Sequence, residues 1–269
     1  MNRIFVMGDI HGDFRHVRSL YDFLIDKPDS TDTLILLGDM GGNFFLDYRD
    51  NNFKKKLGRY GFTYFVVRGN HEQRPSILAE EFSEKWEEEE FFENKVFIEK
   101  EYPYIKYACD HPATYFIKGL RTFIFPGAYS VDKFYRMKMG WSWFESEQLT
   151  PEEMETGRRM IKLQDNKCDL VLSHTCPVIY EPTDLFIKNL DQSMVDKSME
   201  RYLGEIEKDL TYKLWLWGHY HANRIYPKVD NSDKIMIFND MYLDLDKYIE
   251  TKDPYASMIK IHFNSGGLI

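Results

Sequence analysis

The most informative stretch of this sequence is "RIFVMGDIHGD", from Arg3 to Asp13. A short apolar run ends abruptly in a glycine, and Asp9 and His11 follow at once. Runs that are apolar on both faces and contain β-branched or aromatic residues are typical of central strands in a sheet covered on both sides. We therefore predict a buried strand whose carboxyl end presents a carboxylate and an imidazole.

The same pattern returns along the chain in four further stretches. "TLILLGDM" ends in Asp39, "TYFVVRGNHE" in Asn70 and His71, "DLVLSHT" in His174, and "KLWLWGHYH" in His219 and His221. In open α/β sheets, ligands bind beyond the carboxyl ends of the strands. We therefore expect the predicted strands to deliver their polar side chains to one shared site.

Two of these histidines, His219 and His221, are separated only by Tyr220. Successive side chains of an extended chain point to opposite faces, so both imidazoles would share one face and Tyr220 would turn away. We expect Gly218 to let the backbone turn tightly off the strand.

Helical patterns lie between several of these runs. Residues 13–26 and 191–210 carry apolar side chains near helical spacing. Thr150 followed by Pro151 and two glutamates is a strong helix start. The C-terminal stretches "KIMIFND" and "YASMIKIHF" indicate more strands and a second sheet. Because no linker separates independent units, we predict an α/β fold with a single domain over residues 1–269.

Residues 72–113 depart from this rhythm. "EEFSEKWEEEEFFENK" mixes a dense acidic run with aromatic residues. We expect a solvated helix and its connection here. The alternative is a cap or lid inserted beside the site.

Composition and charge limit the classes of function. The chain has 269 residues, 43% of them hydrophobic, which suffices for a large core. Thirty-five Lys and Arg against forty-four Asp and Glu give a net charge of -9, which argues against extensive nucleic-acid binding. The three cysteines form no C-x-x-C pair, and the sequence has neither a signal-peptide pattern nor a membrane-length apolar stretch. We therefore expect a cytoplasmic protein with no membrane partner; the oligomeric state stays open.

The strand-end residues together form a set of metal ligands. The candidates are Asp9, His11, Asp39, Asn70, His174, His219 and His221. Carboxylate, imidazole and amide oxygen suit divalent manganese, zinc, iron and similar ions. The set is too large for one tetrahedral ion and matches two ions that share a bridging carboxylate. We therefore predict two divalent metal ions, with manganese as first choice and iron, zinc or nickel as alternatives.

In their order, the motifs "GDIHGD", "GDM", "RGNHE", "SHT" and "GHYH" resemble those of the calcineurin-like metallophosphoesterases, over residues 9–221. "GDIHG" and "RGNHE" are similar in particular to the protein-phosphatase and diadenosine tetraphosphatase branch. The resemblance implies two central mixed β-sheets in a sandwich flanked by helices, in four layers.

The resemblance also implies a role for each residue. Asp9, His11 and His221 would hold one ion, Asn70, His174 and His219 the other, and Asp39 would bridge them. His71 would be the catalytic histidine, and the Arg68 guanidinium would bind two phosphate oxygens in a bidentate contact. A hydroxide formed between the ions would attack phosphorus in line, and an imidazolium at His71 would protonate the departing alkoxide.

One loop departs from that branch. In "GDMGGN", Gly42 stands where the branch has an aspartate that orients the catalytic histidine, and Asn43 stands where it has an arginine. Asn43, Asp13 or another group could substitute for the missing groups.

Three functions therefore remain to be compared. The first is hydrolysis of phosphomonoesters, either a phosphoprotein or a small phosphorylated metabolite. The second is hydrolysis of diesters, such as cyclic nucleotides, dinucleoside polyphosphates or nucleic-acid ends. The departing loop "GDMGGN" favours it, and so does the aromatic stretch "WSWF" if it is a stacking platform rather than a core or oligomer contact. The third is a non-catalytic interaction module on the same fold. We also expect Glu72 to support the site structurally and residues 175–186 to shape substrate access.

Overall fold

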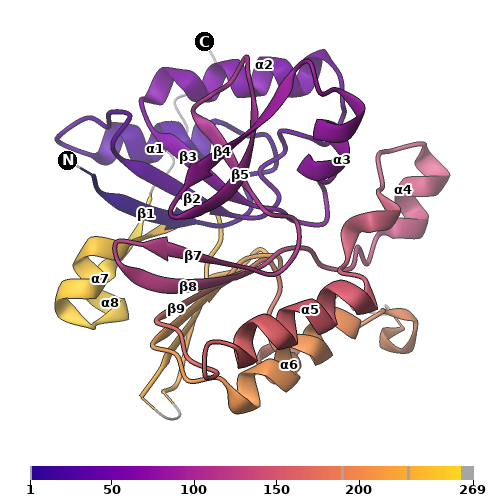
Figure 1. Ribbon diagram of the computed structural model, residues 1–269, viewed down its shortest axis with the longest axis vertical. Coiled ribbons are helices and arrows are strands. Elements are labelled where there is room, and N and C mark those ends of the chain that lie inside the picture. The colour runs from indigo at the N-terminus through magenta and orange to yellow at the C-terminus, as the bar shows by residue number, and fades with distance from the viewer. Residues whose placement is uncertain (1, 189–190, 229–230, 262–269) are drawn as a thin grey trace.

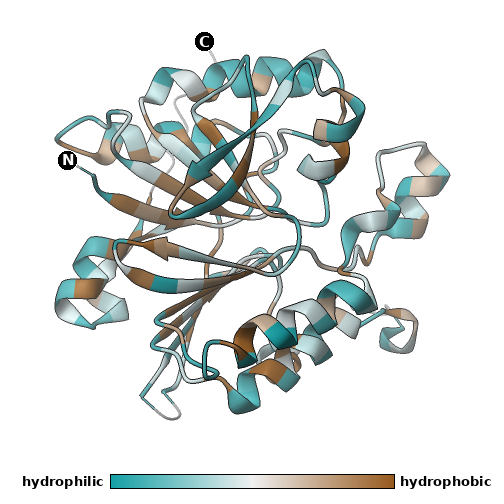
Figure 2. Ribbon diagram, viewed as in Figure 1, coloured by the Kyte–Doolittle hydropathy of each residue, from teal (hydrophilic) through white to brown (hydrophobic). Residues whose placement is uncertain are grey.

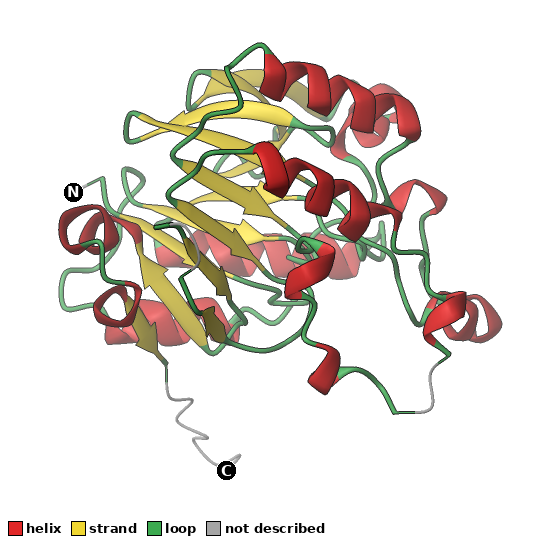
Figure 3. Ribbon diagram, turned by 90° about the horizontal axis from the view of Figure 1, so that it is seen from below, coloured by secondary structure: helices red, strands yellow, loops and turns green. Residues whose placement is uncertain are grey.

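The computed structural model describes residues 2–188, 191–228 and 231–261. Two β-sheets pack face to face, and helices cover both outer faces of the pair (Figures 1 and 3). The predicted α/β sandwich of two mixed sheets flanked by helices is confirmed. No helix within the described ranges is long and apolar enough to cross a lipid bilayer.

The first sheet has eight strands in the order β14-β13-β1-β2-β3-β6-β5-β4. Their bounds are β1 Ile4–Met7, β2 Thr33–Leu37, β3 Thr63–Val67, β4 Trp86–Phe91, β5 Asn94–Glu99, β6 Ile105–Ala108, β13 Met241–Asp244 and β14 Met258–Lys260. The central strands β1, β2, β3 and β6 are parallel, so their carboxyl ends lie at one edge of the sheet.

The second sheet has six strands in the order β11-β12-β10-β9-β8-β7. Their bounds are β7 Ala113–Ile117, β8 Leu120–Phe125, β9 Leu170–Ser173, β10 Leu214–Trp217, β11 Arg224–Tyr226 and β12 Asp233–Met236. The two C-terminal stretches predicted as strands divide between the sheets: β12 pairs with β10, whereas β14 pairs with β13 at the edge of the first sheet. The second stretch is only partly a strand, because residues 255–257 are helical and 262–263 lie outside the described residues.

The helices form the outer layers. Their bounds are α1 Arg15–Phe23, α2 Tyr48–Leu57, α3 Pro75–Glu81, α4 Lys133–Met139, α5 Pro151–Lys162, α6 Ser198–Asp209, α7 Leu245–Thr251 and α8 Pro254–Ser257. The alternation along β1 shows how the layers meet. Ile4 and Val6 belong to the core between the sheets, whereas Phe5 and Met7 belong to the core beneath α1 and α2. Figure 2 shows the resulting apolar interior and two-faced helices.

Two of the three predicted helices have different bounds from those expected. The helix start at Thr150 is confirmed, with a capping box in which Thr150 and Glu153 bond to each other's backbone nitrogens. The helix predicted over 13–26 is shorter, and the one over 191–210 begins only at Ser198. Asp196 accepts a hydrogen bond from the backbone nitrogen of Ser198, so its side chain caps a turn before the helix.

The prediction of a solvated helix in the acidic run is wrong. Residues 86–99 form a β-hairpin, β4 and β5, which extends the edge of the first sheet. Phe92 and Glu93 both have positive φ and close the hairpin. Consecutive glutamates conceal the period of two that marks a strand. Their charge suits an edge strand, because it opposes pairing with another chain.

Candidate metal centre

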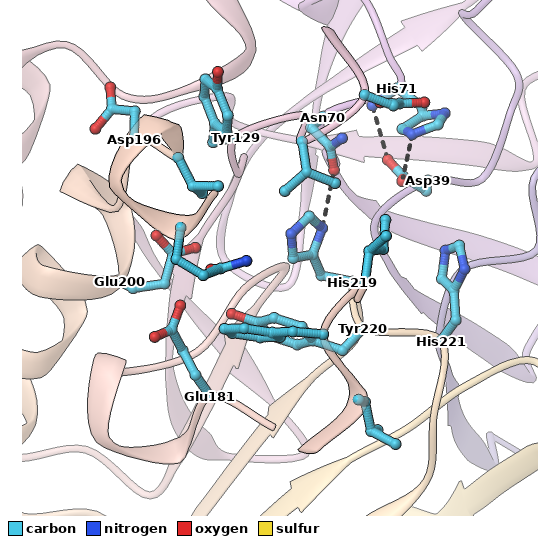
Figure 4. A pocket seen from close by; sticks show the side chains of 17 residues that line it. Asp39, Asn70, His71, Tyr129, Glu181, Asp196, Glu200, His219, Tyr220 and His221 are labelled. Atoms are coloured by element: carbon cyan, nitrogen blue, oxygen red, sulfur yellow. Dashed lines mark hydrogen bonds and ion pairs between the residues drawn. The ribbon is translucent and has the colours of Figure 1, made fainter. Parts of the chain in front are cut away.

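The carboxyl ends of five parallel strands meet between the two sheets. Asp9 follows β1, Asp39 follows β2 and Asn70 follows β3; His174 follows β9 and His219 follows β10. The structure thus brings together all seven predicted ligands, with the two remaining histidines, His11 and His221, in contact with each other. Figure 4 shows Asp39, Asn70, His71, His219 and His221 gathered on one side of a cavity.

The first group of ligands has Asp9, His11 and His221 with donor atoms within 4.8 Å of one another. Nε2 of His11 lies 2.8 Å from Nε2 of His221. Two imidazole nitrogens that face each other so closely offer their lone pairs to one point. That arrangement fits a divalent cation bound to both nitrogens and to a carboxylate oxygen.

The second group centres on the Asn70 amide. Its Oδ1 lies 2.8 Å from Nε2 of His174 and 3.1 Å from Nδ1 of His219. Asp39 lies between the groups: its Oδ2 is 3.9 Å from Nε2 of His11, and its Oδ1 is 3.5 Å from Nε2 of His174. Asp39 is therefore within reach of both groups, as a bridging carboxylate must be.

Hydrogen bonds at the back of the site orient the ligands. Nδ1 of His174 lies 2.7 Å from the backbone oxygen of Leu37. If Nδ1 carries the proton, it donates to this carbonyl and leaves Nε2 free as a ligand atom. The backbone nitrogen of His219 donates to both carboxylate oxygens of Asp9, at 3.0 and 2.9 Å.

The backbone at the site is strained. His11, Asp39, His219 and His221 have φ values of 45°, 45°, 70° and 51°, in the left-handed region that non-glycine residues rarely adopt. This corrects our explanation of the motif around Tyr220. The chain has left the strand there, and both imidazoles reach the site through left-handed backbone rather than through extended alternation.

Two glycines, Gly69 and Gly218, each precede a candidate ligand, and their missing side chains leave room for the carboxylates of Asp39 and Asp9 from neighbouring strands. A Cβ on Gly218 would lie 2.4 Å from Oδ2 of Asp9, and one on Gly69 would lie 2.0 Å from Oδ1 of Asp39. We expected Gly218 to permit a tight turn, but φ is not positive there, and the close approach of Asp9 explains the glycine instead.

The protonation of the site suits a cation. Burial, followed by the neighbouring His11, lowers the pKa of His221 to about 4, and burial also lowers that of His219 well below its ordinary value. Burial raises the pKa of Asp9 to about 8, with a further contribution from Asp39. The neutral imidazoles of His219 and His221 are good ligands. Against the effect of burial, Asp39 and then Asp9 raise the pKa of His174 to about 9, so a cation bound there would displace its proton. The cation would also relieve the repulsion between the two carboxylates.

Glu72 and the loop of the motif "GDMGGN" lie behind the site. Oε1 of Glu72 accepts from the backbone nitrogen of Gly41 at 2.9 Å, and Oε2 accepts from that of Gly69 at 3.3 Å. This confirms the structural role predicted for Glu72. Asn43 is buried, and its backbone oxygen accepts from the nitrogen of Gln73.

Arg68 does not take the position predicted for it. It is buried, and its Nη1 donates to the backbone oxygens of Gly69 and Glu147, at 3.1 and 2.9 Å. Burial lowers its pKa to about 10. The guanidinium thus supports the loop around Glu147 and is not among the groups that line the cavity, which differs from the predicted contact with phosphate.

His71 lies beside the ligands, as predicted, and its backbone nitrogen donates to Oδ1 of Asp39 at 2.9 Å. A residue that sequence reasoning missed touches its ring. Arg136, from α4, has Nη2 3.0 Å from Nδ1 of His71 and closer still to Nε2. Nothing in the motif pattern points to Arg136, because it lies in a segment with neither a strand nor a known spacing.

The cavity beside these ligands has a volume of about 450 Å³. Its wall comes from residues 129–132, 181–187 and 192–200 and from Tyr220, with no contribution from residues 72–113. The apolar side chains of the wall are Val131, Leu185, Phe186, Ile187 and Val195. The segment after His174, which we expected to shape access, thus contributes to the wall.

Comparison with known proteins identifies the family. The sequence model of the calcineurin-like phosphoesterases matches residues 2–223. The chain belongs to this family. A search of curated protein sequences found no significant match.

Solved structures similar to this phosphoesterase include two that align with most of the chain. The protein TT1561 of Thermus thermophilus is 15% identical, with a TM-score of 0.53, over 91% of this chain and 95% of that one. A phosphopantetheinyl hydrolase from Mycobacterium tuberculosis is 14% identical, with a TM-score of 0.46, over 99% and 98%. Family membership and the ligand groups together make the protein a metal-dependent phosphoesterase.

Proposed function

We propose that this phosphoesterase hydrolyses phosphomonoesters at a centre that holds two divalent cations, with manganese the first candidate. The observation that carries the binuclear part is the position of Asp39 between the two ligand groups. Asp9, His11 and His221 would hold one cation, and Asn70, His174 and His219 the other. When bound, such cations supply an activated water and neutralise the phosphoryl oxygens.

The protein's own groups favour a monoester over a diester. A monoester dianion carries more charge than a diester, and Arg136 adds a fixed positive charge next to His71. The cavity of about 450 Å³ suits a small molecule as the leaving group. Its apolar wall would remove that group from water while the phosphoryl group remains at the ligands. A small phosphorylated metabolite therefore fits better than a folded phosphoprotein.

His71 would donate the proton to the leaving oxygen. Phe44 stacks on its ring at 5.8 Å, and Nε2 lies 3.8 Å from Oδ2 of Asp39. Burial, and then Arg136, lower the pKa of His71 to about 4, although Asp39 opposes them. An arriving phosphate dianion acts in the opposite direction, so protonation of His71 would accompany substrate binding.

Diester hydrolysis is the second candidate, because another hollow lies on the far side of His11. It has a volume of about 330 Å³ and is lined in part by Phe14, Phe45, Arg49 and Lys56. Arg49 lies over the Phe45 ring at 3.6 Å, and Lys56 over the Phe14 ring at 4.7 Å. Aromatic and cationic groups of this kind could hold the second arm of a diester.

The deciding experiment compares p-nitrophenyl phosphate with bis-p-nitrophenyl phosphate after reconstitution with manganese. We expect kcat/KM for the monoester to exceed that for the diester by at least about tenfold, which is about 1.4 kcal/mol of transition-state stabilisation. A preference for the diester would reject the monoester proposal. If the manganese-bound protein hydrolyses neither of these esters nor any other phosphoester, the result would favour an interaction module. Metal analysis should find close to two manganese ions per chain, and one ion would reject the binuclear centre.

A further inference from the structure

We propose that Arg136 binds the phosphoryl oxygens of the substrate in this phosphoesterase. The inference rests on the phosphoester chemistry of the proposed function and is independent of the choice between monoester and diester. Arg68, which the sequence suggested for this task, donates through Nη1 to two backbone carbonyls, and its buried Nε and Nη2 have no hydrogen-bond partner in the described chain. What distinguishes Arg136 is its contact with His71. Asn43, in the departing loop, carries no positive charge.

The first argument is position. Nη2 of Arg136 lies 3.0 Å from Nδ1 of His71, whose Nε2 is 3.8 Å from the Asp39 carboxylate. One imidazole thus separates the guanidinium from the ligands. His71 and Asp132, the two side chains that Arg136 contacts through its nitrogens, both line the cavity. Arg136 itself does not line the cavity, so its guanidinium would reach a phosphoryl group held at the ligands by moving past the His71 ring.

The second argument is the unusual burial pattern of α4. This helix lies at the periphery of the fold, beyond the ends of both sheets (Figure 1). Arg136 is its buried residue, 1% exposed, whereas Phe134 is 64% exposed and Tyr135 54%. Soluble proteins normally bury aromatic residues and expose arginine. A helix with the opposite arrangement has little packing reason to hold its arginine inside, which indicates a functional one.

The third argument is incomplete pairing. Nε of Arg136 donates to Oδ2 of Asp132 at 2.8 Å, but buried Nη1 has no hydrogen-bond partner within the described chain. An unpaired buried donor of a charged group costs about 1–3 kcal/mol or more. Nη2 contacts the imidazole ring of His71 rather than a carboxylate. The guanidinium therefore has N–H groups available for an anion, and two oxygens of a phosphoryl group can accept hydrogen bonds from it at once.

The variants Arg136→Ala and Arg136→Lys test the proposal, with Lys138→Gln as the control. Lys138 is an exposed cation on the same helix. Lys138→Gln therefore removes one positive charge, as Arg136→Ala does, but at a position away from His71. The readouts are calorimetric binding of inorganic phosphate to the manganese-reconstituted protein, manganese content, melting temperature, kcat/KM and kcat. We expect Arg136→Ala to weaken phosphate binding about 10–100-fold and to lower kcat/KM at least as much, with the manganese content unchanged.

Arg136→Lys should recover only part of the affinity, because an ammonium group cannot bind two oxygens in the fork geometry. Added guanidine should restore part of the activity of Arg136→Ala, but not that of Lys138→Gln. If a folded Arg136→Ala variant binds phosphate as tightly as the parent, the proposal is wrong, whatever happens to turnover. If Arg136→Ala fails to fold, the same comparison between Arg136→Lys and the parent decides. A preference for diesters together with weakened phosphate binding would reject the monoester proposal and leave this one standing.

Discussion

The floor and the wall of the cavity are built in different ways. The floor is the cluster of seven predicted ligand side chains, Asp9, His11, Asp39, Asn70, His174, His219 and His221, of which Asp39, Asn70, His219 and His221 line the cavity. Each lies shortly after the end of a central strand, and four of the seven are buried. The wall consists of residues 129–132, 181–187, 192–200 and Tyr220. Its short 3₁₀ turns present exposed apolar side chains such as Leu185 and Ile187, and the start of α6 completes it.

The difference separates chemistry from recognition. Strands fixed by two packed sheets hold the floor, and this rigidity can maintain the left-handed backbone at Asp39 and His219. Loops that no strand constrains form the wall, so its residues can change without disturbing the ligands. We therefore expect changes in the floor to abolish turnover of every ester, and changes in the wall to alter the choice among esters.

The largest effect should come from Asp39→Asn. This variant removes the negative charge shared by both ligand groups, so we expect activity to fall by about 10³-fold or more and both metals to be held more weakly. Activity assays and metal analysis after manganese reconstitution measure the two losses. Normal turnover by Asp39→Asn would show that Asp39 is no bridge.

A matched control stands at the opposite end of the same strand. Asp32 precedes β2, is buried like Asp39, and pairs with Arg3 at 2.7 Å, far from the ligands. Asp32→Asn should lower stability and retain the manganese content. Loss of metal from both variants would mean that unfolding, rather than a missing ligand, explains the result for Asp39→Asn.

The sequence predicted the floor much better than the wall, for a physical reason. A buried strand followed by a metal-competent side chain is a local pattern, so all seven candidate ligands could be named from the sequence, and the structure brings them together. The wall depends on which loops meet in space, and residues 191–197 were assigned to an α-helix although they contain only a short 3₁₀ helix, Gln192–Met194. Arg136 gave no signal because its burial depends on where α4 packs. The position predicted for Arg68 failed for the same reason, since a motif does not fix where a long side chain points.

A smaller, selective effect should come from Phe186→Ala in the wall. Phe186 stacks on Tyr220 at 6.4 Å and lines the cavity. Loss of its contact with a bulky leaving group should cost about 1.4 kcal/mol, or about tenfold in kcat/KM. We expect that loss for 1-naphthyl phosphate and less than about a twofold change for glycerol phosphate. Ile179→Ala, at an exposed position outside the cavity lining, is the control. Equal losses on both esters would argue that Phe186 supports the floor instead.

The smallest effect on turnover should come from Glu200→Gln, at the point where wall and floor touch. Glu200 is buried and lines the cavity, and its Oε1 accepts from the hydroxyl of Thr175 at 2.7 Å, next to His174. Burial raises the pKa of Glu200 from 4.5 to about 7, so the folded chain holds this proton more tightly than the unfolded chain. The resulting stability is fully present below pH 4.5 and is lost as pH rises through about 7. Glutamine keeps the acceptor and cannot ionise.

The free energy of unfolding of Glu200→Gln should therefore match that of the parent at pH 4.5 and exceed it by on the order of 1 kcal/mol at pH 7.5. This is less than the pKa difference alone would give, because the site relaxes locally. Urea denaturation at both pH values measures this difference, and comparison within one pH cancels the titration of the ligands. Glu205→Gln, at an exposed position on the same helix, should show no such divergence, because Glu205 pairs with Arg158 in contact with solvent. If Glu200→Gln and the parent lose stability in parallel between these pH values, Glu200 is already ionised in the folded chain, and a cation in the wall must compensate it.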